Sequence, residues 1–149
     1  MVRTIKTVPG NAVTYMIDNP NSILIHVCND RKVMGAGIAK EIRERLPNAF
    51  KAYVEASDTL GTISISERVV NMVAQSSMRR HKYDNNRYLN YGALAAALQQ
   101  VAHIVPTNIE VVLPHGMGAC RAGGNFEIVM ELVTFLLPKH NITVVRLSE

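Results

Sequence analysis

Two glycine-containing stretches of this chain have the composition of anion-binding loops. In residues 24–42, "LIHVCNDRKVMGAGIAKEI", Gly35 and Gly37 lie between an apolar run and a predicted helix. In residues 116–126, "GMGACRAGGNF", four glycines precede a strongly amphipathic segment. Glycine lets backbone N–H groups approach an anion, and a helix N-terminus adds partial positive charge. Each stretch alone predicts either a phosphate or ribose site or an ordinary turn, and the pair together favours the site.

Neither stretch has the fingerprint of a common nucleotide-binding fold. A P-loop requires Lys and then Ser or Thr after its last glycine, whereas Gly37 is followed by Ile and Ala. A Rossmann fingerprint requires a third glycine three residues after the second. Lys40 stands at that place after Gly37, and Arg121 after Gly118. The sequence therefore supports neither fold, although Arg121 could add a charged clamp if it is not simply exposed.

Four side chains near these stretches could take part in acid–base or nucleophilic chemistry. His26 could orient or deprotonate a water, because its pKa lies near working pH, or it could be a core histidine. Asp30 could be a base or a turn residue. A thiolate at Cys28 or Cys120 requires a nearby cation or helix N-terminus, and we expect both to be small buried residues. No Cys/His pair has metal-ligand spacing, so we expect no metal site.

Size and composition indicate one domain that spans residues 1–149. The chain is 48% hydrophobic, and its two cysteines are too few for a disulfide framework. No stretch has the roughly 18 consecutive apolar residues of a membrane span, and the first residues lack a signal-peptide run, so we expect a cytoplasmic location. A net charge of +4 favours an anionic partner. With 5% aromatic residues and no Trp, we do not expect a nucleic-acid partner, and the oligomeric state is left open.

Strand-like and helical patterns alternate along the chain. We predict strands at residues 3–8, 12–16, 23–27, 62–66, 69–73, 109–113 and 142–147. We predict helices at about residues 38–46, 49–54, 88–103 and 126–137, with Pro47 ending the first. This alternation predicts an α/β sandwich with a mostly parallel sheet. Ligands bind outside the carboxyl ends of such strands, which points to the loops after Val27, Val73 and Leu113.

Several motifs together resemble the macro domain family. The stretches "LIHVCND", "MGAGIA", "LPNAFKAYVE" and "MGACRAGGNF" are similar to its ADP-ribose-1″-phosphate phosphatase branch, and to macro domains that remove ADP-ribose from proteins. "VVNMVAQ" and "RYLNYGALAAAL" lie where that branch has its middle strand and following helix. The resemblance implies a three-layer α/β/α sandwich with a mixed, mostly parallel sheet of about six strands. It also implies that ADP-ribose or a derivative binds above the sheet, without a cofactor.

The resemblance also implies a set of ligand-binding residues. Asn11 matches the residue that contacts the adenine amino group, although turn chemistry after Pro9-Gly10 explains it equally well. Asn29 and the first glycine stretch match the distal ribose loop, and the second stretch matches the diphosphate loop. Gln75 and Ser76 could contact the terminal ribose or its phosphate, or be a polar strand end. The predicted ligand-binding residues are Asn11, Ala12, Asn29, Gly35, Ala36, Gly37, Ile38, Gln75, Ser76, Met117, Gly118, Ala119, Cys120, Arg121, Ala122, Gly123, Gly124 and Phe126.

The predicted catalytic residues are His26 and Asn125. The resemblance aligns His26 with a histidine implicated in phosphatase catalysis, and Asn125 with a position at which related enzymes often carry Asp. An asparagine has no titratable group and is no general base, but it could bind a phosphate or cap the following helix. No lysine follows the central strand directly, and the nearest is Lys82, which disfavours a covalent lysine mechanism. His115 could face either ligand or solvent.

The predicted function is hydrolysis of ADP-ribose 1″-phosphate to ADP-ribose and phosphate. The alternatives are cleavage of a glycosidic link between ADP-ribose and a macromolecule, and binding of ADP-ribose or a related nucleotide without catalysis. The basic segment "RRHKYDNNR", residues 79–87, contains Arg79, Arg80, Lys82 and Arg87. It could be a solvated loop, a flap over a phosphate ligand, or a nucleic-acid contact in which Tyr83 stacks on a base.

Overall fold

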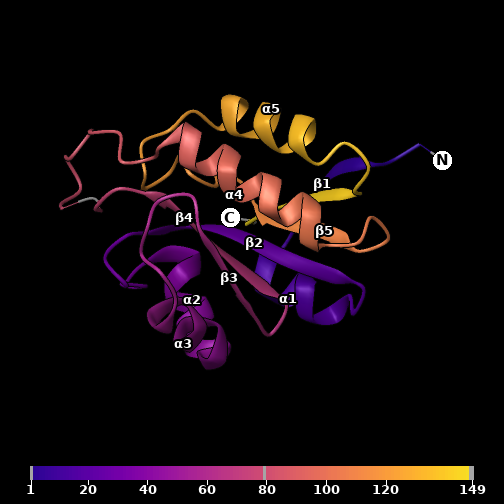
Figure 1. Ribbon diagram of the computed structural model, residues 1–149, viewed down its shortest axis with the longest axis horizontal. Helices are drawn as coiled ribbons and strands as arrows, with labels where there is room; N and C mark the ends of the chain where they lie inside the picture. The colour runs from indigo at the N-terminus through magenta and orange to yellow at the C-terminus, as the bar shows by residue number, and fades with distance from the viewer. Residues whose placement is uncertain (1, 79, 148–149) are drawn as a thin grey trace.

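The computed structural model describes residues 2–78 and 80–147, in which six strands and five helices form an α/β fold (Figure 1). The strands are β1 (Ile5–Pro9), β2 (Ser22–Asn29), β3 (Ile63–Ser66), β4 (Val69–Gln75), β5 (Glu110–Pro114) and β6 (Ile142–Arg146). The helices are α1 (Ala12–Asp18), α2 (Gly37–Arg45), α3 (Pro47–Glu55), α4 (Tyr91–Ile104) and α5 (Phe126–Leu136).

All six strands belong to one mixed sheet with the order β1-β6-β5-β2-β4-β3. Every neighbouring pair is parallel except β3 and β4, which form an antiparallel hairpin at one edge. Because β2, β4 and β5 are adjacent and parallel, their carboxyl ends lie at the same edge of the sheet. The two glycine stretches follow β2 and β5, so this topology brings them together.

Two apolar clusters make the molecule a three-layer sandwich, as predicted. Alternate residues of the central strands face α4 and α5 on one side and α1, α2 and α3 on the other. For example, Ile25 of β2 packs in the cluster with α4 and α5, whereas Leu24 packs in the cluster with α1, α2 and α3. Burial on both faces explains the continuous apolar runs of β2 and β4.

The predicted strand over residues 12–16 is wrong, because this segment forms α1. Its β-branched residues gave the strand-like pattern. Asn11 caps the helix by accepting a hydrogen bond from the Thr14 N–H. Ala12, Val13 and Met16 are then buried on one helical face, so the cap and burial outweigh local propensity.

The helix predicted from residue 88 begins instead at Tyr91. Asn90 caps it by accepting from the Ala93 N–H. The N–H groups of Tyr88 and Leu89 both donate to the Ala122 carbonyl, so these residues are extended and pack against the second glycine stretch. Pro47 ends α2 as predicted and is also the first residue of α3. In the described part of the chain, none of the helices is long and apolar enough to cross a bilayer.

Candidate functional site

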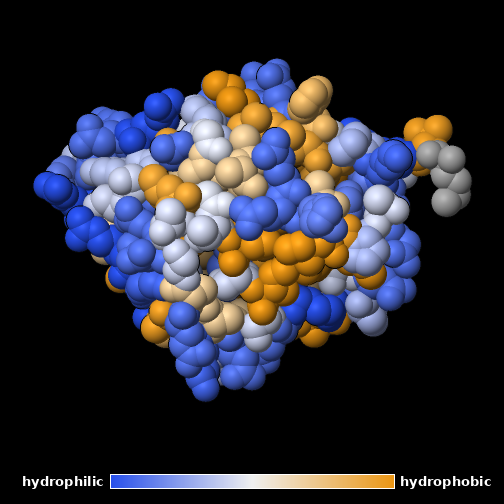
Figure 2. Space-filling model, in the orientation of Figure 1, coloured by the Kyte–Doolittle hydropathy of each residue, from blue (hydrophilic) through white to orange (hydrophobic). Residues whose placement is uncertain are grey.

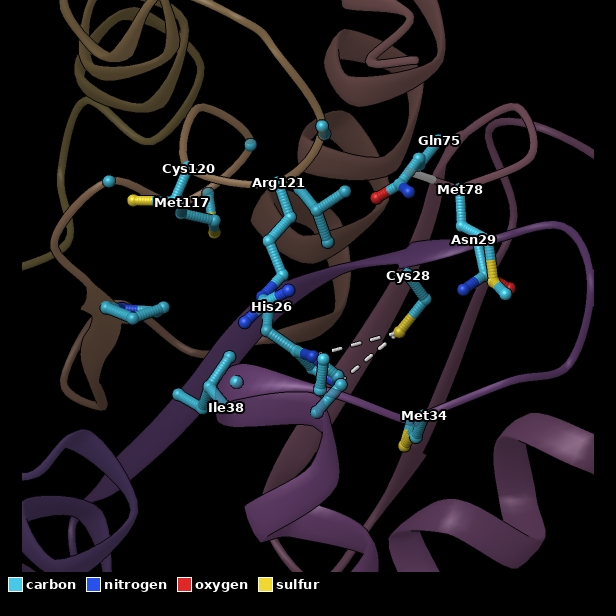
Figure 3. Close-up of a pocket in the computed structure, with 18 of the residues that line it drawn as sticks. His26, Cys28, Asn29, Met34, Ile38, Gln75, Met78, Met117, Cys120 and Arg121 are labelled. Atoms are coloured by element: carbon cyan, nitrogen blue, oxygen red, sulfur yellow. Dashed lines mark hydrogen bonds between the residues drawn. The ribbon is translucent and has the colours of Figure 1, made fainter. Parts of the chain in front are cut away.

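A cavity of about 460 Å³ lies at the carboxyl ends of β2, β4 and β5 (Figure 3). Its walls come from the first glycine loop (residues 30–36, with the start of α2) and the second glycine loop (residues 115–125). The predicted site residues that line it are His26, Asn29, Gly35, Ala36, Gly37, Ile38, Gln75, Met117, Gly118, Cys120, Arg121 and Ala122. The structure therefore brings both glycine loops to one cavity.

The two loops meet where Arg121 lies against Gly37. Figure 3 shows Arg121 extending from the second glycine loop into the cavity. A Cβ atom at Gly37 would lie 3.3 Å from Arg121 Nε, and Gly37 has φ +58°. Glycine therefore avoids both backbone strain and a crowded contact at this point. Within the described residues, Arg121 forms no hydrogen bond or ion pair.

The start of α2 is the second source of positive potential in the cavity. Its N-cap residue, Ala36, provides no side-chain hydrogen bond, and its first turn contains no acidic residue. By contrast, asparagines cap α1, α4 and α5. Arg121 is the one Lys, Arg, Asp or Glu among the described residues that line the cavity. The cavity is therefore electropositive and has no counter-charge in its walls.

Asn29 and Tyr53 fix the shape of the first glycine loop. Asn29 Nδ2 donates to the Val33 carbonyl at 2.8 Å, and Asn29 Oδ1 accepts from the Arg31 N–H at 2.9 Å. The buried hydroxyl of Tyr53 lies 2.6 Å from the Asn29 carbonyl oxygen and 2.8 Å from its Oδ1. Lys32 Nζ donates to the carbonyl of Tyr53 at 3.0 Å. The side chain of Asn29 therefore organises the loop backbone that lines the cavity.

His26 lies at the base of the cavity but is almost completely buried. Asn71 uses its amide nitrogen as donor to Ala49 O and Ser64 Oγ, so its Oδ1 accepts the hydrogen of His26 Nε2 at 2.6 Å. Burial lowers the pKa of His26 to about 4, and the hydrogen bond to Asn71 opposes this only in part. At neutral pH the imidazole is therefore uncharged and weakly basic.

The two cysteines have different environments. Cys28 is buried as predicted, with Sγ 3.4 Å from His26 Nε2 (Figure 3), and burial raises the pKa of its thiol. Cys120 is exposed, so the prediction that it is buried is wrong. It lies in a surface loop, where its Sγ packs over Gly116: a Cβ at that glycine would be 2.5 Å away. The described residues contain no cluster of three or more His, Cys, Asp or Glu that could hold a metal.

Asn125 lies outside the walls of the cavity and caps α5. Its Oδ1 accepts hydrogen bonds from the N–H groups of Glu127 at 2.8 Å and Ile128 at 3.4 Å. Phe126, the next residue, packs its ring against His115, with 4.9 Å between ring centroids, and His115 lines the cavity. The helix cap expected of Asn125 is therefore present, and its carboxamide oxygen is used by the helix.

Seven other predicted residues also lie outside the cavity walls, namely Ala12, Ala119, Asn11, Ser76, Gly123, Gly124 and Phe126. Asn11 Nδ2 donates to Glu41 Oε2 at 2.9 Å while its oxygen caps α1. Gly123 packs against the backbone of Asn86, and Gly124 against Leu89. These two glycines therefore hold the second glycine loop against the segment before α4.

Sequence reasoning missed much of the apolar wall of the cavity. The additional lining residues are Val27, Cys28, Val33, Met34, Ala39, Met78, Pro114, His115, Gly116 and Leu147. Pro114 directly follows a predicted strand end and could have been found from the topology. His115, for which the sequence left ligand and solvent both open, lines the cavity. Met78 and Leu147 carry no local pattern that links them to the glycine loops. Asp30 lies outside the walls, and its carboxylate accepts from the Ser77 N–H at 2.8 Å.

The basic segment packs beside the second glycine loop. Arg79 lies outside the described residues. Asp84 organises the turn: its carboxylate accepts from the Tyr88 hydroxyl and from the Arg80 and Asn86 N–H groups, and the Tyr88 bond contributes most to lowering its pKa to about 2. Of the described residues in this region, Met78 lines the cavity, whereas Arg80, Lys82 and Arg87 do not. A role as a flap stays a prediction.

Comparisons with known proteins identify the fold. Neither protein-family models nor curated proteins match the sequence. A Bacteroides thetaiotaomicron protein of unknown function has a TM-score of 0.80 and 22% identity over 98% of this chain and 99% of that chain. The macrodomain of Mycobacterium tuberculosis DarG has a TM-score of 0.72 and 19% identity, over 96% of this chain and 97% of that chain.

A Thermosipho africanus DarTG structure in complex with ADP-ribose is also similar. Its TM-score is 0.70 at 16% identity, and the match covers 97% of this chain and 42% of that chain. The chain therefore has the macro domain fold, which confirms the predicted fold class. The finer assignment to the phosphatase branch stays a prediction.

Proposed function

We propose that the cavity binds ADP-ribose, or a nucleotide derivative that contains it, with the diphosphate held between the two glycine loops. The observation that carries the proposal is the position of Arg121 at the uncapped start of α2. A guanidinium beside the positive end of a helix is unfavourable in the absence of an anion. A diphosphate there would accept hydrogen bonds from both groups and remove the repulsion.

The remainder of the cavity suits the nucleoside and sugar parts of such a ligand. Met34, Ile38 and Met117 contribute apolar surface to its walls, which can pack against a base or a ribose ring. Asn29 and Gln75 supply polar atoms at the ends of β2 and β4. The ADP-ribose in the similar DarTG structure supports this choice of ligand.

Calorimetric titration with ADP-ribose, beside AMP and NAD, tests the proposal. Arg121→Gln should weaken ADP-ribose binding by about 10- to 100-fold, because a hydrogen bond to a charged group is worth about 1.5–3 kcal/mol. Arg43→Gln is the matched control. It also replaces one arginine by glutamine, but Arg43 is a residue of α2 that does not line the cavity. Equal affinity in wild type and Arg121→Gln, or no binding of ADP-ribose at millimolar concentration, would contradict the proposal.

Hydrolysis of ADP-ribose 1″-phosphate is a second candidate, favoured by the position of His26 at the base of the cavity. A neutral imidazole could position a water beside the terminal phosphate. The lowered pKa of His26 and the position of Asn125 outside the cavity walls favour simple binding instead. Release of phosphate that His26→Gln abolishes, with ADP-ribose affinity retained, would support hydrolysis.

Cleavage of a glycosidic link to ADP-ribose is tested separately. Release of ADP-ribose from an ADP-ribosylated protein or nucleic acid would indicate a glycohydrolase that uses the same cavity. If neither this substrate nor ADP-ribose 1″-phosphate is turned over while ADP-ribose binds, the protein is a binding module.

A further inference from the structure

Helix α5 is apolar around most of its circumference. Its sequence, FEIVMELVTFL, has only Glu127, Glu131 and Thr134 as polar residues. Val129 and Val133 are buried against the sheet. A helix that is apolar on all sides is normally buried on all sides, yet α5 is the outermost element of its layer in Figure 1. Its outer face therefore exposes two large apolar side chains, Ile128 and Phe135, beside Glu127 and Glu131.

The outer face of α5 forms an apolar groove. Ile128, Leu132 and Phe135 are spaced i, i+4, i+7, and they line an open groove together with Arg3, Glu131, Thr134 and Pro138. Phe135 is 80% exposed. In Figure 2, apolar residues gather along the upper edge of the molecule over α5, interspersed with hydrophilic ones. We call this groove the α5 face.

The charges around the α5 face are arranged with opposite signs at its two ends. Glu127 lies in the first turn of the helix and Glu131 at its middle, whereas Lys139 follows the end of the helix and Arg3 packs there, with its Nη2 donating to the Thr134 carbonyl at 2.9 Å. Among the described residues, none of these four side chains has an ion-pair partner. When two copies of this face meet with their helices antiparallel, the acidic residues of each copy therefore lie near the basic residues of the other.

We propose that the α5 face is a homodimer interface, in which α5 packs antiparallel against α5 of a second copy across a two-fold axis. Such an axis uses one patch on both subunits. An axis between Leu132 and Phe135 places the acidic half of each helix beside the basic end of the other. The apolar seam is then covered, and the helix dipoles are antiparallel. No residue of α5 lines the ligand cavity, so this assembly leaves both cavities open.

Sedimentation velocity from low micromolar to near-millimolar protein measures the dimer. Phe135→Glu should weaken the dimer by at least about tenfold, because it places a charge in the centre of an apolar interface. Val54→Glu is the matched control. Val54 is the penultimate residue of α3, as Phe135 is of α5, and is 42% exposed on the opposite layer, so its substitution should leave the dimer unchanged.

A charge exchange tests the antiparallel arrangement without altering the apolar seam. Glu127→Lys and Lys139→Glu should each weaken the homodimer, because both variants place like charges opposite one another. An equimolar mixture of the two variants, at physiological salt, should recover the dimer as a heterodimer. A monomer at every concentration of the wild-type chain, a dimer that Phe135→Glu does not weaken, or a mixture that stays monomeric would each overturn the proposal.

Discussion

At the scale of single residues, His26 illustrates how burial decides the chemistry of a side chain. The sequence offered two interpretations, a catalytic histidine and a histidine of the core. In the structure its ring borders the cavity, but Nε2 is used by Asn71 and Cys28 lies against it. Its position near the end of β2 could be predicted from the sequence. Its partner Asn71 could not, because the pairing of β2 with β4 brings together residues that are far apart in the chain.

The lowered pKa of His26 predicts a loss of stability in acid. The unfolded chain binds a proton at a pKa near 6.5, whereas the folded chain does so only at about 4. Stability is therefore fully present above pH 6.5 and falls as the pH drops towards 4. Between pH 7 and pH 5, His26 should remove about 2 kcal/mol from the free energy of unfolding, which urea denaturation at the two pH values measures.

A non-titrating variant isolates this contribution. His26→Gln keeps a donor for Asn71 but binds no proton. Between pH 7 and pH 5 its free energy of unfolding should therefore fall by about 2 kcal/mol less than that of the wild type. His103→Gln, at an exposed histidine of α4, serves as the control and should retain the wild-type loss. Equal losses in all three proteins would show that His26 titrates normally in the folded chain.

At the scale of elements, the two helices that follow the glycine stretches differ in how their first turns are capped. The sequence indicated a helix start after each glycine stretch, and both are present. Asn125 caps α5, whereas Ala36 leaves α2 uncapped at the cavity. The cap could be predicted because Asn before an amphipathic segment is a local signal. Residues 12–16 were misread as a strand because the deciding contacts, the Asn11 cap and the burial against the sheet, are not contained in residue propensities.

The role of Asn125 as a cap predicts how its variants behave. Asn125→Ala should lower the free energy of unfolding by about 1 kcal/mol. Asn125→Asp should retain the stability, because a carboxylate also caps and interacts favourably with the helix dipole. Thermal unfolding and ADP-ribose titration of both variants measure these effects. An ADP-ribose affinity that falls by tenfold or more in the stable Asp variant would assign Asn125 a direct contact with the ligand instead.

At the scale of the whole molecule, the cavity depends on the sheet topology and on contacts between distant segments. The alternation of strands and helices predicted the layered fold, and the parallel strands predicted the edge at which the loops meet. The apolar wall was not predictable, because Met34, Met78 and Leu147 come from segments with no common periodicity. Only the folded chain brings them together.

One such distant contact joins the second glycine loop to the segment before α4, and it predicts an effect on stability. A Cβ at Gly123 would lie 2.6 Å from Asn86 O, at a residue with φ +74°. Gly123→Ala should therefore lower the free energy of unfolding by about 1–3 kcal/mol. Gly35→Ala is the control, because its nearest contact is an ordinary 3.5 Å to Val33. Urea denaturation should show the wild-type value for Gly35→Ala, and equal effects of both variants would contradict this account.

The parallel pairing of β1 with β6 has a practical consequence for probes attached to the chain. Ile5 pairs with Ile142 and Pro9 with Arg146. The amino ends of β1 and β6 therefore lie together on one side of the molecule, and their carboxyl ends lie together on the opposite side. A fluorophore joined ahead of Arg3 would sit next to the groove on α5 and report self-association. One joined behind Leu147 would sit beside the cavity for which we propose ADP-ribose binding, and would report its occupancy. Two labelled versions of one protein could thus follow the two proposed events separately.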